Sequence, residues 1–413
     1  MSRRVMVVCY YFPPLGLGGV GRPLNLYKYL PGHGWDCDIL TVRSVAYRAY
    51  EPELLHGVRT DGIFRSGSYD PQRMLCLLGI RTLKHSTIRR GRPVSDRFFP
   101  DSKVGWVRPA VRLGTRLMRR RKYNAIISTS PPISSHLVAM ELAKQHSLPW
   151  IADFRDFWTM YKIDESYADA RNKGRAHELK ESIVRTCSRI TAVNPAITDY
   201  LGQGEVITNG FDIDRAEQWK PPADSTSFVI GIPGTFNEER VVEPLLAVVE
   251  AVKQRRPDLY DRIRFVQVGL VEPQWLGAMF ESHGLRTRVE IHGLQKRDRT
   301  IEIFSQCHLF YLGLTAEREQ GILPQRMFDM AASGRPVLAS ASADSEICRF
   351  IRLTGAGFCF TERDRDRAAG YLTDTIERAI RGELAITRLP DYALPYSSDA
   401  MACSFAKLLD ALT

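Results

Sequence analysis

The stretch Val5-Met-Val-Val-Cys-Tyr-Tyr-Phe12 is followed by Pro13-Pro14, by Leu15-Gly-Leu-Gly-Gly19 and then by a segment from Val20 to Leu30. An apolar run bounded by Pro and Gly predicts a strand buried on both faces, as in a parallel sheet. The apolar spacing of the last segment predicts a helix. A strand, a glycine turn and a helix start place backbone N–H groups at the carboxyl edge of a sheet, where open α/β proteins bind phosphates. The stretch lacks GxGxxG and GK[ST], so it predicts neither a dinucleotide fingerprint nor a P-loop, and a plain connecting turn is the alternative.

The length of 413 residues predicts two domains, because single cores stop growing beyond about 250–300 residues. Hydrophobic residues make up 44% of the chain and charged residues 25%, which is typical of a soluble globular protein. No apolar run approaches the roughly 20 residues that a membrane-spanning helix needs. The apolar run after Arg3-Arg4 stops at Pro13-Pro14, so we interpret it as the first strand rather than as a signal peptide.

The cysteine pattern predicts no metal site. The eight cysteines have no CxxC spacing and no neighbouring histidine cluster, so we expect reduced packing residues of a cytoplasmic protein. Asp212-Ile-Asp214 is a literal DxD, a carboxylate pattern that can hold a divalent cation. It stands before a linker without a third carboxylate nearby, so we expect no metal there either.

The net charge of +10 is unevenly distributed. Residues 1–150 hold 24 Lys and Arg against 9 Asp and Glu, hence +15, which leaves −5 for the remainder. Much of the excess lies in residues 81–97 and in Arg108–Lys122, where arginines recur every three or four residues among apolar ones. This spacing predicts a basic amphipathic helix, which is a solvated face, a contact with an anionic membrane surface or a contact with a phosphate-rich partner. No nucleic-acid recognition motif accompanies the charge, so we expect no nucleic-acid partner.

Strand-like and helix-like segments alternate along both halves of the chain. The apolar runs predict strands at residues 5–11, 37–42, 125–129, 150–154, 189–193 and 205–208, and then at 228–232, 263–268, 289–292, 309–312, 336–340 and 357–360. Two successive alternating units indicate an α/β fold with two Rossmann-like, doubly wound parallel sheets. We predict an N-terminal domain over residues 1–217, a linker over 218–227, a second domain over 228–390, and a C-terminal helix within 391–413 that packs back on the first domain.

The sharpest motif of the second half is Gly321-Ile-Leu-Pro-Gln-Arg-Met-Phe-Asp-Met-Ala-Ala-Ser-Gly-Arg-Pro336. Pro324 is suited to a first helical turn, so the N–H groups of Gln325 and Arg326 are expected to point out of the helix start. A helix start beside a guanidinium is a strong diphosphate receptor. Asp329 follows one turn later and is placed to accept hydrogen bonds from ribose hydroxyls. A capped surface helix before a strand is the alternative.

The segment Trp150-Ile-Ala-Asp-Phe-Arg-Asp-Phe-Trp158 places three charged side chains, those of Asp153, Arg155 and Asp156, at the end of a buried strand. Two interpretations are open: a structural Asp–Arg ion pair, or an acceptor-binding and catalytic cluster. His136, near the start of the preceding helix, is interpreted as a packing or capping residue rather than a base.

Together these segments resemble the GT-B glycosyltransferases, specifically their retaining glycogen-synthase-like and mannosyltransferase-like group. The resemblance covers nearly the whole chain, and its pieces fall in the order of that group. The pieces are Tyr10-Tyr-Phe-Pro-Pro14 with Gly18-Gly19, Ser128-Thr-Ser-Pro-Pro132, Ile151-Ala-Asp-Phe-Arg-Asp-Phe-Trp158, Thr191-Ala-Val-Asn194, Asn209-Gly-Phe-Asp212, Gly234-Thr235 and Met327-Phe-Asp-Met-Ala-Ala-Ser-Gly-Arg-Pro336.

The resemblance implies a metal-independent transferase without a resident cofactor, with a nucleotide-sugar donor on the second domain and an acceptor on the first. It implies that Gly18 and Gly19 lie over the diphosphate and the acceptor, and that Arg326 with the neighbouring Gln325 amide holds the diphosphate. It further implies acceptor-side and donor-sugar contacts from the Asp153–Asp156 cluster. The remaining implied donor contacts are Thr235, Arg240, Gly293, Leu294 and Asp329.

This chain departs from the family at two places. Gly321 stands where the family often has the first of two glutamates, and Asp329 stands at the second. Gly234-Thr235-Phe236-Asn237 replaces the usual basic pair, so we take Arg240 as the substitute cation.

We therefore expect a cytoplasmic, retaining glycosyltransferase that is peripheral on the inner membrane face. Its acceptor is expected to be lipid-linked, a polysaccharide precursor or a natural product. Two alternatives are a nucleotide-sugar 2-epimerase, which shares the architecture, and a non-catalytic GT-B subunit.

Overall fold

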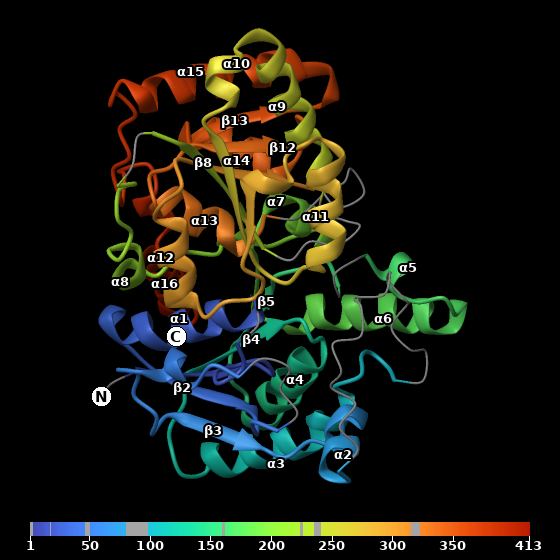
Figure 1. Cartoon of the computed structure of the whole chain (residues 1–413). Helices are drawn as coiled ribbons and strands as arrows, with labels where there is room; N and C mark the ends of the chain where they lie inside the picture. Colours follow the sequence, from blue (N-terminus) through green and yellow to red (C-terminus); the bar gives the residue numbers. More distant parts are fainter. Residues whose placement is uncertain are drawn as a thin grey trace. The chain divides into compact units, whose positions relative to one another are not determined.

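The computed structural model describes residues 3–16, 18–45, 50–79, 98–158, 162–223, 226–234, 241–314 and 323–413. The chain divides into two compact units (Figure 1): unit 1 comprises Met1–Asn209 with Ser398–Thr413, and unit 2 comprises Gly210–Ser397. None of the described helices is long and apolar enough to cross a bilayer.

Each unit is built on a parallel sheet, and the strand order reverses in the middle of each sheet. Among the described residues the unit 1 order is β3 (Ile63–Ser66), β2 (Trp35–Val42), β1 (Arg3–Val8), β4 (Ala125–Ser130), β5 (Trp150–Phe154), β6 (Arg189–Ala192) and β7 (Glu205–Val206). The unit 2 order is β10 (Val289–Ile291), β9 (Ile263–Val268), β8 (Phe228–Pro233), β11 (Leu309–Gly313), β12 (Val337–Ser340) and β13 (Gly357–Phe360). The α/β fold predicted from the sequence, with two doubly wound parallel sheets, is confirmed.

Strand β1 shows why its sequence is apolar at every position. Val5 and Val7 face one hydrophobic cluster, while Met6 and Val8 face another, so both faces of the strand are buried. The first cluster includes residues of α1 (Gly21–Tyr29) and α16 (Ser398–Asp410), which pack together on that face. The second cluster includes residues of α3 (Val107–Met118) and α4 (Ser134–His146) (Figure 1). The C-terminal helix α16 therefore belongs to unit 1.

The other described helices are divided between the two units. In unit 1 they are α2 (Pro71–Leu77), α5 (Ile163–Ser166), α6 (Ala170–Thr186) and α7 (Pro195–Leu201). In unit 2 they are α8 (Ile213–Ala216), α9 (Glu243–Arg255), α10 (Pro257–Tyr260), α11 (Pro273–Ser282), α12 (Arg297–Phe304), α13 (Gln325–Ala332), α14 (Glu346–Thr354) and α15 (Arg365–Ile380). Local signals explain several ends: Asn194 caps α7, Ser345 caps α14, and Gly355 ends α14 in the left-handed region.

The residues just before β8 belong to unit 2 and carry a buried aromatic side chain. Trp219, within the segment 218–227 that we predicted as a linker, is buried and lies under the Arg335 guanidinium, 5.1 Å from the ring centroid. Arg335 is itself fully buried and donates to the carbonyls of Lys220, Ser305 and Cys307. Because backbone carbonyls and an aromatic face surround it, this cation fixes the chain before β8 to the core of unit 2.

The expectation that all eight cysteines are reduced is wrong for one pair. Cys348 on α14 and Cys359 on β13 form a disulfide, with their Cα atoms 5.6 Å apart. The residues are eleven positions apart, and the turn at Gly355 folds the helix back onto the strand, which brings the two thiols together. The spacing of the cysteines gave no CxxC signal because this pairing depends on the tertiary contact.

Candidate active site

The carboxyl edge of the unit 1 sheet is organised by Arg155 at the point where the strand order reverses. Strands β1 and β4 are neighbours there, and the loops that follow them lead to the glycine turn and to Ser130-Pro131. Arg155 donates from Nη1 to the Gly19 carbonyl at 2.5 Å, from Nη2 to the Pro131 carbonyl at 2.8 Å and from Nε to the Ser130 carbonyl at 2.9 Å. One guanidinium therefore holds both loops in place.

The backbone of Gly19 lies close to the Arg155 guanidinium. A Cβ atom built on Gly19 would lie 3.2 Å from Nη1 of Arg155. The neighbouring Gly18 begins the short 3-10 turn of residues 18–20 that leads into α1. The glycine turn therefore connects strand to helix as the sequence predicted, and its backbone is tied to the adjacent loop by Arg155.

Asp153 lies at the end of β5 and is sealed inside unit 1. Its carboxylate accepts two hydrogen bonds from Arg22, at 2.9 Å from Nε and at 2.8 Å from Nη2. The hydroxyls of Thr129 and Thr191 donate to the same carboxylate at 2.7 and 2.8 Å. Burial alone would raise the pKa of Asp153, but the Arg22 charge and these donors hold it below its ordinary value. Asp153 is thus ionised, and both of its carboxylate oxygens are bound to Arg22 and to a threonine hydroxyl.

Arg22 connects this ion pair to the rest of unit 1. Its Nη1 donates to the Thr208 carbonyl and its Nη2 to the Ile207 carbonyl, just beyond β7. The guanidinium also lies over the Phe405 ring of α16. These contacts favour the ion-pair interpretation of Asp153, with Arg22 rather than Arg155 as the partner. Asp156 is half-buried and acts electrostatically on Arg155.

In unit 2 the sequence-predicted residues gather at the start of α13. The residue before the helix is Pro324, and no side chain caps this end. Because the first turn of a helix has N–H groups without intrahelical partners, the start of α13 presents donors and a partial positive charge. Arg326 donates from Nη1 to the carbonyl of Pro233 at the end of β8, at 2.5 Å. Gln325 donates its side-chain amide to the carbonyl of Gly210 at 2.6 Å.

Asp329 lies one turn further along α13 among several cations. Its side chain is exposed, and it interacts electrostatically with Arg215, Arg297 and Arg326. Arg215 also forms an ion pair with Asp298 at 3.5 Å. The start of α13 is therefore a cationic region of unit 2 in which Asp329 is an exposed carboxylate, with Asp212 also close enough to act on it.

Three loops at the carboxyl edge of the unit 2 sheet are joined by backbone hydrogen bonds. Gly234 donates to Val268, and Gly269 donates to the Gly293 carbonyl at 2.8 Å. Gly269 has a φ of +141°, and a Cβ there would lie 2.2 Å from the Gly234 carbonyl oxygen, so only glycine fits. Leu294 follows Gly293 and is 55% exposed. The loop that begins at Gly293, which we predicted to contact the nucleotide base, is therefore held at its first residue by a backbone hydrogen bond.

Other sequence-predicted residues fall outside the described residues or outside these groups. Thr235, Arg240 and Gly321 lie outside the described residues. Asp212 and Asp214 stand at the start of α8. Within the described ranges no group of three His, Cys, Asp or Glu side chains is arranged to hold a metal ion.

His136 is a packing residue, as the sequence interpretation held. It is fully buried, its ring lies 4.5 Å from the Phe154 ring, and its Nδ1 is 2.7 Å from the Ser128 hydroxyl. Burial lowers its pKa to about 3, so the ring is neutral at physiological pH.

Sequence reasoning missed Arg22 and a polar network around Tyr10. A charged residue on the core side of the helix after the glycine turn is the signal that could have identified Arg22, because such a charge needs a buried partner. In the network, the Tyr10 hydroxyl donates to Asp70 at 2.6 Å and accepts from Arg73 at 2.9 Å. Lys103 lies 3.6 Å from Asp70, and burial lowers the pKa of this lysine.

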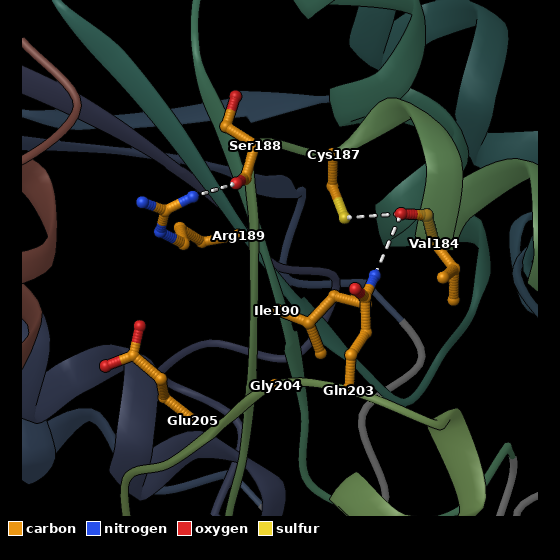
Figure 2. Close-up of a pocket in the computed structure, with 8 residues that line it drawn as sticks. All are labelled: Val184, Cys187, Ser188, Arg189, Ile190, Gln203, Gly204 and Glu205. Carbon is orange, nitrogen blue, oxygen red and sulfur yellow. Dashed lines mark hydrogen bonds between the residues drawn. The ribbon is translucent and has the colours of Figure 1, made fainter.

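A cavity of about 330 Å³ in unit 1 lies away from all these residues. Figure 2 shows that its lining comes from the end of α6, the start of β6 and the turn before β7, with Arg189 and Glu205 as its charged members. Gln203 and Cys187 both donate to the Val184 carbonyl (Figure 2). Because it borders the first residue of β6, it lies at the amino edge of the sheet, opposite the edge that carries the candidate site.

No protein-family profile matches this chain, and no curated protein sequence matches it. Solved structures do match. Sucrose-phosphate synthase from Thermosynechococcus elongatus is similar with a TM-score of 0.65 and 13% identity over 99% of both chains. Anabaena HepE in complex with UDP has a TM-score of 0.62 and 14% identity over 99% of this chain and 100% of its own. WaaG, a glycosyltransferase involved in lipopolysaccharide biosynthesis, has a TM-score of 0.57 and 12% identity over 99% of both chains. The chain therefore has the GT-B fold.

Proposed function

We propose that the chain is a glycosyltransferase that moves a sugar from a nucleotide-sugar donor to an acceptor, with retention of configuration. In this proposal no metal and no resident cofactor takes part, unit 2 binds the donor and unit 1 binds the acceptor. The fold supports it, since structures of the same fold include glycosyltransferases and a complex with UDP. Fold alone does not assign chemistry, so the proposal depends on the residues at the start of α13.

The start of α13 is the observation that carries the proposal. The uncapped helix end offers N–H donors and a partial positive charge of about half a unit. Arg326 adds a full charge, and its bond to the Pro233 carbonyl holds it in a fixed position. A diphosphate leaving group gains negative charge as the donor sugar departs, and donors fixed before the reaction stabilise that charge most effectively.

Neighbouring groups complete the proposed donor site. Exposed Asp329 is assigned to the ribose hydroxyls, and the backbone of Gly293 and Leu294 to the edge of the base. Gln325 contributes its backbone N–H, because its side-chain amide is bound to Gly210. Thr235 and Arg240 remain proposed donor contacts, as do the Gly18 and Gly19 amides of unit 1.

The proposed step is a displacement on one face of the donor sugar. The bond between the anomeric carbon and the diphosphate oxygen breaks while a bond to the acceptor hydroxyl oxygen forms. The acceptor proton passes to an oxygen of the leaving phosphate, so no side-chain base is needed. Asp153 has no part in this step, because both its oxygens are bound to Arg22 and to hydroxyls.

For the acceptor we propose a lipid-linked or polysaccharide-precursor sugar, reached from the cytoplasmic side by a peripherally bound enzyme. The charge of the first 150 residues, +15 from 24 basic and 9 acidic residues, favours an anionic acceptor or surface. A soluble natural-product acceptor is the variant with the same donor chemistry. Arg155 and Asp156 are the proposed acceptor-side residues, with Arg155 as the positioning group of the two loops.

Donor binding is the first test. The full chain is mixed with UDP-, GDP-, dTDP- and ADP-sugars with and without EDTA, and its thermal midpoint is followed. We expect a stabilising shift for one nucleotide class that survives EDTA. Replacing Arg326 by Ala should remove the shift and lower turnover by about 10²- to 10³-fold. The matched control is R349A, an exposed arginine of the neighbouring helix α14, which should change neither. Equal behaviour of the two variants would refute the proposed diphosphate site.

Two other functions give different results in the same assays. A nucleotide-sugar 2-epimerase converts its donor without any acceptor, so the product formed from donor alone distinguishes it. A non-catalytic subunit of this fold gives no donor-dependent shift. An EDTA-sensitive shift would contradict the metal-free site.

A further inference from the structure

Helix α2 of unit 1 exposes an unusual amount of apolar surface. Leu77 and Leu78 are 65% and 71% exposed, although leucine is among the residues most often buried. Tyr69, Met74 and Leu75 are exposed beside them. Tyr69 and Leu78 flank the helix, and exposed apolar side chains gathered in one place are typical of interaction sites. We call these five residues the α2 apolar surface.

This helix is fixed to the sheet from below. Asp70 caps its start by accepting from the Arg73 N–H, and the Tyr10 hydroxyl donates to the same carboxylate. Arg73 is buried and donates to Tyr10 and to the Arg43 carbonyl. Tyr10 follows β1, so α2 is held by groups at the carboxyl edge of the sheet. The apolar residues of α2 therefore face outward because its polar residues bind inward.

A strongly basic helix face begins beside it. Helix α3 packs on unit 1 through Ala110, Gly114 and Leu117, while Arg108, Arg112, Arg116 and Arg119 are exposed. Residues 107–122 contain no acidic residue. Among the described residues none of these four arginines forms an ion pair. We call them the α3 arginines.

Backbone contacts place the starts of the two helices next to each other. The Tyr69 N–H donates to the Gly105 carbonyl at 3.1 Å, and a Cβ on Gly105 would lie 2.7 Å from the Tyr69 backbone. Tyr69 is two residues before α2 begins and Gly105 is two residues before α3 begins. Figure 1 shows α2 and α3 beside each other at the bottom of unit 1.

We propose that the α2 apolar surface and the α3 arginines together dock unit 1 onto an anionic lipid bilayer. The α2 leucines enter the interface between headgroups and acyl chains, and the α3 arginines bind lipid phosphates. An exposed apolar element near a row of guanidinium groups suits a bilayer, because the apolar residues can enter the interface while the guanidinium forks bind phosphate oxygens. This inference deepens the membrane contact in the proposed function by adding an inserted apolar element, and it does not depend on sugar transfer.

The test is co-sedimentation of the full chain with vesicles of phosphatidylcholine, with and without 30% phosphatidylglycerol as the probe lipid. We expect binding only with the anionic lipid. The variant R108Q/R112Q/R116Q should bind roughly 100-fold more weakly, since each basic residue near such a surface contributes about 1 kcal/mol and each 1.4 kcal/mol is about tenfold. The variant L77Q/L78Q should keep low-salt attraction but dissociate when salt is raised, because its remaining binding is electrostatic.

Matched controls come from unit 2. The variant R349Q/R363Q/R365Q removes the same charge from exposed positions, and L353Q replaces a leucine that is 70% exposed on α14. Both should bind vesicles as the unaltered chain does. Donor thermal shifts measured on the same samples separate failure of the donor site from failure of docking. The inference is overturned if controls and test variants lose binding equally, or if no vesicle is bound. It is also overturned if L77Q/L78Q instead abolishes a concentration-dependent dimer, since the surface would then join two copies of the chain.

Discussion

Replacing Asp153 by Asn distinguishes a structural carboxylate from a catalytic one. The change removes the negative charge that faces buried Arg22 while keeping nearly the same shape. Breaking a buried ion pair by removing one partner costs about 3–5 kcal/mol, because the remaining charge is left uncompensated. Arg22 keeps its bonds to the Ile207 and Thr208 carbonyls, which do not neutralise it. We therefore expect the free energy of unfolding of unit 1 to fall by most of this amount.

Denaturant and thermal unfolding followed by tryptophan fluorescence give the measurement. Four of the six tryptophans, at positions 35, 106, 150 and 158, lie in unit 1. For a unit of this size the thermal midpoint should fall by roughly 6–20 °C, at about 2–4 °C for each kcal/mol. The double variant R22M/D153N should lose about 1–3 kcal/mol less than the sum of the single variants, since each single change leaves the other group unpaired.

The pH dependence of stability also tests the ion pair, and its direction follows from the lowered pKa of Asp153. Because the pKa of Asp153 in the folded chain lies below its ordinary value, its stabilising contribution is complete above the ordinary Asp range. That contribution is lost as the pH falls through the lowered folded pKa. The variant D153N should therefore show a shallower loss of stability in acid. If it unfolds within about 0.5 kcal/mol of the unaltered chain yet loses transfer, the structural assignment is refuted and an acceptor-side role is required.

Three further predictions concern buried groups. Replacing Arg335 by Met should destabilise unit 2 by about 3 kcal/mol, because the carbonyls of Lys220, Ser305 and Cys307 lose their donor; R335K should lose nearly as much, since an ammonium cannot reach all three. The variant C348S/C359S should lose up to about 3 kcal/mol from the short loop that the disulfide closes, seen as a lower midpoint that reductant also produces in the unaltered chain. His136, with its pKa lowered to about 3, should make stability fall as the pH drops below about 6.5, by up to about 1.4 kcal/mol per unit, and H136Q should reduce that slope in urea titrations.

The fold was predictable because its sequence signals are local and repeated. Each buried parallel strand is a short apolar run, and the predicted strand at residues 150–154 has the bounds of β5. The short strand β3 was missed, because Ile63-Phe-Arg-Ser66 is only half-buried and has no apolar run. Helix α2 was missed for the related reason that its leucines face solvent, so no burial pattern marks it.

The candidate site was predictable in position but not in role. The sequence placed Asp153, Arg155 and Asp156 at the end of one strand, and the structure has them there. The sequence did not predict that Arg22, 131 residues earlier, forms an ion pair with Asp153, because pairing between distant segments depends on the order of the strands in the sheet. The same limit applied to Arg155, whose three partners are carbonyls and therefore leave no residue-type signal.

The docking surface and the glycine turn are connected through one residue, and this predicts how the acceptor is used. Tyr10 lies between β1 and the glycine turn, and its hydroxyl holds Asp70 at the start of α2. A bilayer bound by α2 would therefore lie near the edge of the sheet that carries the turn and Arg155. A lipid-linked acceptor would then reach that edge without leaving the membrane, whereas a short soluble acceptor would gain nothing from docking. We expect L77Q/L78Q to lower kcat/KM at least tenfold for an acceptor embedded in anionic vesicles, as the loss of about 1.4 kcal/mol of membrane binding requires. The same variant should leave kcat/KM for a soluble acceptor analogue, and the donor thermal shift, unchanged. An equal loss with both acceptors would show that α2 acts on the site itself and not through the membrane.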